Sequence, residues 1–177
     1  ERREPMVQRV AIKVEGDGPL GKMVTEGNSY GRVRGYVSKP ATTLPSPLQS
    51  TDVDIALGRH GLLTVVKDLR LKDLYEGVVP LQGGQLDSDL VYYFMQSEQT
   101  PTLVEIDVKL NAKDELQAAG GLLLQLLPDA EPTILRSLAE RIDDLPNFAE
   151  QLAQGANPEA ILATVFGPIA YDLLETR

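Results

Sequence analysis

The feature that most constrains this chain is a change of periodicity near Pro128. Before it, apolar and polar residues alternate over several stretches, as in strands with one solvent-exposed face. After it, apolar residues recur every three or four positions, as in amphipathic helices. Strands followed by separate helices predict an α+β fold. We therefore expect a mainly antiparallel sheet domain with packed helices over residues 1–128 and a small all-helical segment over residues 129–177.

Five short strands are predicted in the first part of the chain. Tight turns separate the first three, which indicates an antiparallel meander. Pro80 cannot donate a hydrogen bond to a neighbouring strand, so we expect the fifth strand at a sheet edge or Pro80 at its end. The five predicted strands cover residues 8–15, 22–26, 32–37, 62–67 and 77–81.

The middle of the chain predicts one helix and two longer strands. The helix contains Leu90, Tyr93 and Phe94, begins behind Asp87 or Ser88 as a cap, and ends before Pro101. In the strand over 102–110, apolar residues share one face while the charged residues between them share the solvent-exposed face. Residues 116–127 are apolar almost throughout, which is typical of a buried central strand whose glycines permit close backbone approach.

Three helices are predicted after Pro128. Leu135, Leu138 and Ile142 form one apolar stripe, and Phe148 with Leu152 forms a second. The third helix begins at 157–159, where an asparagine cap precedes a proline and an acid, both favoured in a first turn. Gly155 and Gly167 end the second and third helices.

The charge and cysteine content exclude several classes of function. The chain of 177 residues carries 17 basic and 26 acidic side chains and a net charge of −9, so nucleic acid and anionic membranes are poor partners. It contains no cysteine, which excludes disulfides, thiolate metal sites and a thiol nucleophile. No apolar run approaches the ~18 residues of a membrane span.

The glycine pattern at Gly16, Gly18 and Gly21 matches a dinucleotide-binding fingerprint, but its context does not. Pro19 removes an amide that could bind a phosphate, and the few residues before Gly27 are too short for the required helix. No acid follows about 20 residues later to bind a ribose. We therefore interpret this motif as a turn between strands, without a cofactor.

The remaining polar candidates are weak. His60, the sole histidine, lies in a Gly-Arg-His-Gly loop signal without the partners that a zinc site or a general base needs, so we expect it to be solvated. Acidic pairs are frequent on a chain with 26 acids and are expected at solvated strand edges and helix ends. These pairs are Asp52 with Asp54, Asp87 with Asp89, and Asp143 with Asp144.

Four motifs in order resemble one family over essentially the whole chain. They are GDGPLG (16–21), VRGYV (33–37), SEQTP (97–101) and AAGG (118–121), the last followed through Gln125 to Pro128. Tyr75 to Gly77 and Tyr93-Phe94 fit the same pattern. On these residues the chain resembles the 33-kilodalton chaperonins, redox-regulated heat-shock holdases of bacteria and some organelles.

The resemblance implies a chaperone and not an enzyme. It implies an ATP-independent holdase of the stress response that binds unfolded client proteins. The resemblance also implies a homodimer. The expected location is the bacterial cytoplasm, or the stroma or matrix of an organelle in a eukaryote. It also implies that a further segment precedes Glu1 and that a four-cysteine zinc module follows Arg177, so residues 129–177 correspond to the family's linker. The redox switch would reside in that zinc module, and this chain itself needs no cofactor.

Client binding is expected at apolar positions of the helical segment, which become accessible only when its helices loosen. The expected residues are Ile134, Leu138, Ile142, Phe148, Leu152, Ile161, Leu162 and Phe166. Three alternatives stay open: clients could bind the sheet, the apolar stripes could pair with a second copy in an oligomerisation module, or carboxylates such as Asp87 and Glu98 could serve a small-molecule enzyme.

Overall fold

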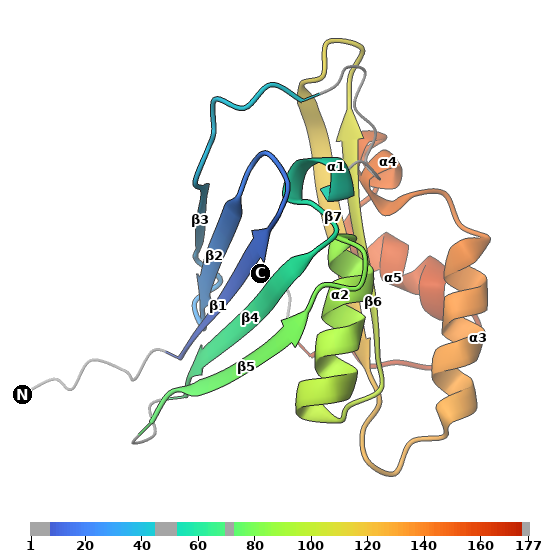
Figure 1. The fold of residues 1–177 in the computed structure, drawn as a ribbon. Coiled ribbons are helices and arrows are strands. Elements are labelled where there is room, and N and C mark those ends of the chain that lie inside the picture. Colours follow the sequence, from blue (N-terminus) through green and yellow to red (C-terminus); the bar gives the residue numbers. More distant parts are fainter. Residues whose placement is uncertain (1–7, 45–52, 70–72, 175–177) are drawn as a thin grey trace, which may run out of the picture. The chain divides into compact units, whose positions relative to one another are not determined.

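The computed structural model describes residues 8–44, 53–69 and 73–174, and it confirms an α+β fold with antiparallel sheets (Figure 1). The chain divides between Glu98 and Gln99 into two compact units. The first unit contains β1 (Arg9–Gly16), β2 (Lys22–Asn28), β3 (Val33–Val37), α1 (Val53–Leu57), β4 (Gly61–Asp68), β5 (Tyr75–Pro80), α2 (Leu86–Tyr93) and the π-helical turn η1 (Phe94–Glu98). The second contains β6 (Thr102–Leu110), β7 (Leu116–Gln125), α3 (Pro132–Asp143), α4 (Phe148–Ala153) and α5 (Pro158–Phe166).

The first unit is built on a five-stranded antiparallel sheet in the order β3-β2-β1-β4-β5. The predicted meander over the first three strands is confirmed. Pro80 is the last residue of β5, which is an edge strand, so its missing N–H costs no bond of the sheet.

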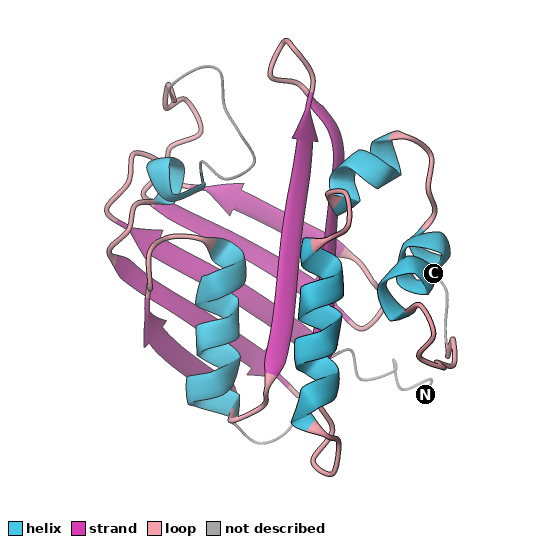
Figure 2. Ribbon diagram, turned by 90° about the vertical axis from the view of Figure 1, so that its right-hand side faces the viewer, coloured by secondary structure: helices cyan, strands magenta, loops and turns pink. Residues whose placement is uncertain are grey.

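One face of this sheet forms the core of the first unit. Val14, Leu63 and Val79 stand side by side on β1, β4 and β5 and are buried. Helix α2 lies across this face in Figure 2 and contributes Tyr93, which is fully buried. The opposite face carries Tyr36 and Val78 in one row, and both are exposed.

The GDGPLG motif is a turn between β1 and β2, as predicted. Its backbone packs against the end of α1, a helix that the sequence analysis did not predict: the N–H of Gly18 donates to the carbonyl of Leu57 at 2.9 Å. A side chain at Gly16 would overlap the same carbonyl oxygen. Gly16 and Gly18 therefore serve close packing of the backbone against the end of α1.

Residues of three family motifs meet where η1 packs on the sheet edge. The ring of Tyr93 lies on Gly77, where a Cβ would stand only 2.7 Å from it. The Tyr75 hydroxyl donates to the Ser97 carbonyl at 3.1 Å. Glu98 forms a half-buried ion pair with Lys67. Burial, together with the adjacent carboxylate of Glu98, raises the pKa of the Tyr93 phenol.

The start of α2 differs from the prediction. Gln85 is the N-cap residue, and Asp87 and Ser88 lie within the first turn. Asp89, predicted to be solvated, is 1 % exposed. Its Oδ1 accepts a hydrogen bond from the N–H of Gln82 at 2.5 Å. The prediction is wrong because the Asp89 carboxylate points inward and binds the backbone of the loop that connects β5 to α2.

The second unit contains a long two-stranded antiparallel hairpin, β6–β7. Residues 116–127 were predicted to form a buried central strand, and this is wrong. β7 pairs only with β6 among the described residues, and its side chains alternate between half-buried and exposed positions. Leu123 illustrates the exposed set, with half of its surface accessible.

Asp89 predicts a measurable pH effect on stability. Burial raises the pKa of its carboxyl, although the N–H groups of Gln82 and Gly84 oppose the shift. A raised folded-state pKa means that the native state binds more protons than the unfolded state, whose Asp pKa is about 3.9. The free energy of unfolding should therefore fall as the pH rises from about 3.9, the unfolded-state pKa, through the higher pKa of Asp89 in the folded protein.

We expect Asp89→Asn, which keeps an oxygen acceptor for Gln82, to gain stability relative to the unaltered protein as pH rises through this window. Urea unfolding of both proteins at several pH values between 4 and 7 measures the difference. A difference in free energy that stays constant across this range contradicts the prediction. The charge of Asp87 in the same turn adds to the raised pKa of Asp89, so Asp87→Asn should weaken the pH dependence but not abolish it, because the buried carboxyl remains.

Candidate functional site

Helices α3, α4 and α5 form an apolar cluster with one face of the β6–β7 hairpin. These three helices span residues 132–166 of the predicted segment 129–177, and from here on the name helical segment refers to them alone. The buried members of the cluster all come from the helical segment, and half-buried leucines of the hairpin pack against them. The buried members are Leu138, Ile142, Phe148, Ile161 and Val165, and the hairpin leucines are Leu103, Leu122 and Leu124.

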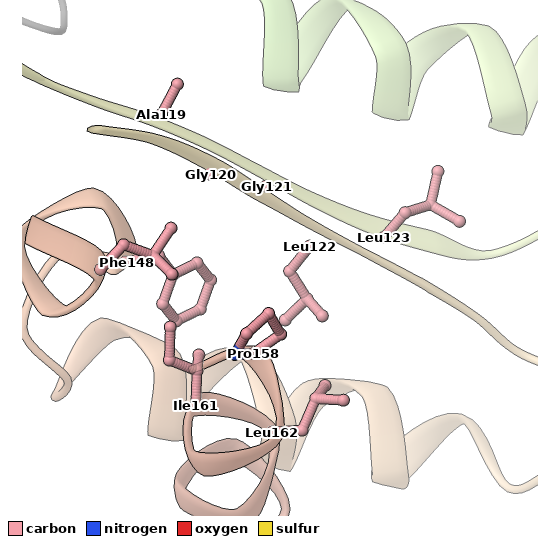
Figure 3. Close-up of a pocket in the computed structure, with 10 residues that line it drawn as sticks. Ala119, Gly120, Gly121, Leu122, Leu123, Phe148, Pro158, Ile161 and Leu162 are labelled. Atoms are coloured by element: carbon pink, nitrogen blue, oxygen red, sulfur yellow. The ribbon is translucent and has the colours of Figure 1, made fainter. Parts of the chain in front are cut away.

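An apolar groove of about 420 Å³ runs between β7 and the helices α4 and α5. Figure 3 shows Leu122 pointing toward Phe148 and Ile161, whereas Ala119 and Leu123 project to the other side of the strand. Gly120 lets α4 come close, because a Cβ there would lie 2.7 Å from the Cδ1 of Leu152. The sequence predicted a close approach of backbone at the β7 glycines, but the neighbour that Gly120 admits is a side chain.

The ends of α5 are fixed by side chains. Asn157 caps its start, as predicted, with Oδ1 accepting from the N–H of Ala160 at 2.8 Å. At the other end, the guanidinium of Arg141 on α3 donates to the carbonyls of Val165 and Thr164, at 3.0 and 3.2 Å. A cation at a helix C-terminus satisfies free carbonyls and matches the helix dipole.

The start of α4 is held by a residue of the hairpin. Asp107 accepts hydrogen bonds from the Asn147 side chain at 2.6 Å and from the N–H of Phe148 at 2.7 Å. The prediction placed the charged face of β6 toward solvent, and this is wrong. That face packs against α4, where Lys109 also pairs with Glu150 at 3.6 Å.

The structure gathers most of the predicted client-binding residues into this one cluster. Leu138, Ile142, Phe148 and Ile161 are buried, and Leu152 and Phe166 pack half-buried against them. Leu162 lines the groove. Ile134 is 40 % exposed in the first turn of α3. Whether these residues bind clients stays a prediction.

Neither Val165 on α5 nor the hairpin residues that the helices pack against were predicted to belong to the site. Val165 is fully buried, although no predicted stripe included it. Leu122 and Leu124 face the helices together with Gly120. Their spacing of two residues was the available signal, since Ala119, Gly121 and Leu123 between them fall on the opposite face of the strand.

The remaining polar candidates do not form a catalytic arrangement in the described parts of the chain. The His60 side chain is 86 % exposed, as expected, and its Nδ1 lies 3.3 Å from the Oδ2 of Asp17. Asp54, predicted to be solvated, has a side chain only 10 % exposed that accepts from Arg59. Asp52 lies outside the described residues.

The carboxylates considered for an enzyme are engaged locally. Asp87 accepts from the N–H of Ser88 at 2.6 Å, and Glu98 pairs with Lys67. Asp143 and Asp144 are exposed at the end of α3, as predicted. The described residues bring no group of three potential metal ligands together, and none of their helices has the length and apolarity needed to cross a membrane.

Comparisons with known proteins agree on one family. Residues 6–177 match the model of the family described as Hsp33 protein. The chain is 45% identical over 170 residues to the 33 kDa chaperonin of Citrifermentans bemidjiense and 40% identical over 168 residues to that of Latilactobacillus sakei. It also resembles the crystal structure of the 33 kDa chaperonin from Thermotoga maritima, with a TM-score of 0.78 and 35% identity.

The matches cover nearly all of this chain but only part of each relative. They span 96% and 94% of this chain and 58% of the length of each of the two relatives. The Thermotoga structure covers 90% of this chain, which in turn covers 55% of that protein.

The cap at Asn157 predicts how much one side chain contributes to the helical segment. Asn157→Ala leaves the N–H of Ala160 without its acceptor and should cost about 1 kcal/mol of stability. Asn157→Asp keeps the acceptor and should stay close to the unaltered protein. Urea unfolding followed by circular dichroism measures both variants, and equal stability of all three proteins contradicts the prediction.

Proposed function

The chain belongs to the Hsp33 family, and we propose that the protein is an ATP-independent holdase chaperone that binds unfolded proteins under oxidative and heat stress. The observation that carries this proposal is the apolar cluster beneath the helical segment, in a chain whose relatives bear the name of a chaperonin. Short helices over apolar residues can loosen and expose a surface that suits unfolded chains.

The proposal assigns different roles to two parts of the chain. Residues 1–128 would form the chaperone core and residues 129–177 the linker that covers and uncovers apolar surface. This division concerns function, since the compact units divide after Glu98 instead. In the full-length protein, zinc-bound cysteines beyond Arg177 would provide the redox switch.

Unfolded or aggregation-prone proteins would be the partners, and the protein would act as a homodimer in the cytoplasm of a bacterium. The bacterial relatives support this location. Size-exclusion chromatography with light scattering tests the dimer. A light-scattering assay with a thermally unfolding client tests the holdase activity, and a protein that leaves client aggregation unchanged at stoichiometric excess contradicts it.

Replacing Phe148 and Leu152 together by serine tests where clients bind. We expect client affinity to fall by about tenfold or more, because each apolar side chain contributes roughly 1.5–3 kcal/mol when buried against a client. Aggregation of the client at several chaperone concentrations measures the change, and circular dichroism verifies that the sheets remain.

The control is a second double variant, Tyr36→Ser with Val78→Ser. It removes two exposed apolar side chains from the other face of the five-stranded sheet. Full suppression by the Phe148 and Leu152 variant, with loss in the Tyr36 and Val78 variant, would place the client surface on the sheet.

Redox insensitivity of this 177-residue chain is a separate prediction. The chain has no cysteine, so no thiolate can be oxidised and no thiolate-bound zinc released. We expect equal suppression of client aggregation in dithiothreitol and in peroxide. Activity that appears only after peroxide treatment would contradict the prediction and indicate oxidation of the methionines Met6, Met23 and Met95.

A further inference from the structure

Asp107 makes the most direct polar contact between the hairpin and α4. Both of its carboxylate oxygens are used: Oδ1 accepts from the Asn147 side chain and Oδ2 from the N–H of Phe148. Asn147 is itself the N-cap of α4, because its Oδ1 accepts from the N–H of Glu150 at 3.1 Å. A single carboxylate on β6 therefore fixes both the cap residue and the first amide of the helix.

Phe148 and Ala149 at this end of the helix are buried, but the packing leaves a gap beside Asp107. A cavity of about 230 Å³ lies at the contact, and Glu105, Asp107 and Asp143 all line it. Apolar packing is thus incomplete here, and three carboxylates share the space. The neighbouring ion pair between Lys109 and Glu150 joins side chains that are 40 % and 44 % exposed, and such pairs contribute little.

Helices α3 and α5 are joined to each other by a different contact. Arg141 joins α3 to the C-terminus of α5 and leaves the hairpin out of the contact. Helix α4 has six residues, which is too short to persist without tertiary contacts. The two charged side chains therefore join different elements: Asp107 joins α4 to the hairpin, and Arg141 joins α3 to α5.

We infer that Asp107 is a latch whose two hydrogen bonds keep α4 on the β6–β7 hairpin. When they are lost, α4 leaves the strand while α3 and α5 stay joined through Arg141. Gly120, Leu122 and Phe148 are the first residues uncovered, because they meet where α4 covers β7. The use of this opening for client binding rests on the proposed function, whereas the opening itself does not.

Hydrogen exchange of the full 177-residue chain, followed by mass spectrometry, tests the latch. In Asp107→Asn one side-chain oxygen becomes an N–H donor that faces another donor. We expect the amides of α4 to exchange at least about tenfold faster, as the loss of one hydrogen bond to a charged group implies. The amides of β1 and β4 should exchange at their original rate, which verifies that the first unit remains folded.

Two variants serve as controls. Asp143→Asn neutralises another carboxylate of the same cavity and should leave exchange in α4 unchanged. Arg141→Gln should accelerate exchange at the end of α5 and leave the start of α4 protected. Unchanged α4 exchange in Asp107→Asn overturns the latch, and so does an equal acceleration in every element of the chain.

The aggregation assay separates the latch from the proposed function. If Asp107→Asn exchanges faster in α4 and also suppresses client aggregation at lower concentration, both are supported. If α4 exchanges faster while suppression stays the same, the latch stands and the proposed client surface beneath α4 is wrong.

Discussion

Burial of the hairpin leucines beneath three short helices is the interaction on which the second unit depends. Helices α4 and α5 have six and nine residues, below the roughly 12–15 at which an isolated helix becomes even marginally stable. The buried residues of the cluster come from the helices, and the hairpin supplies the half-buried leucines that they pack against, so the cluster is complete only when both are in contact. The order of the helices is therefore coupled to their contact with β7, and a local opening costs less than global unfolding.

Local patterns predicted much of this architecture. Alternation located the strands because side chains in a strand point to opposite faces, and Pro80 marked an edge because it lacks an N–H. Asn157 was identified as a cap from its immediate neighbours alone, since a cap and its amide lie three residues apart. The apolar stripes likewise identified the helical half of the candidate site.

Contacts between distant residues could not be predicted in this way. Alternation in β6 indicates that its two faces differ, but it does not say which face another element covers. Asp107 reads as a solvated residue until its partner Phe148, 41 residues later, is placed beside it. Asp89 was missed for a similar reason, because its partner is the backbone of a loop before the helix. The hairpin half of the site depends on the same kind of distant pairing.

The turn at residues 16–21 explains why a glycine pattern can imitate a ligand-binding loop. Such loops bind anions by offering backbone N–H groups where no Cβ blocks the approach. Here the N–H groups of Asp17 and Gly18 already donate to the carbonyls of His60 and Leu57. The loop thus presents backbone N–H groups as a ligand-binding loop does, but the groups that they bind are carbonyls of the protein's own main chain. The motif therefore acts as a binding site for the turn between α1 and β4.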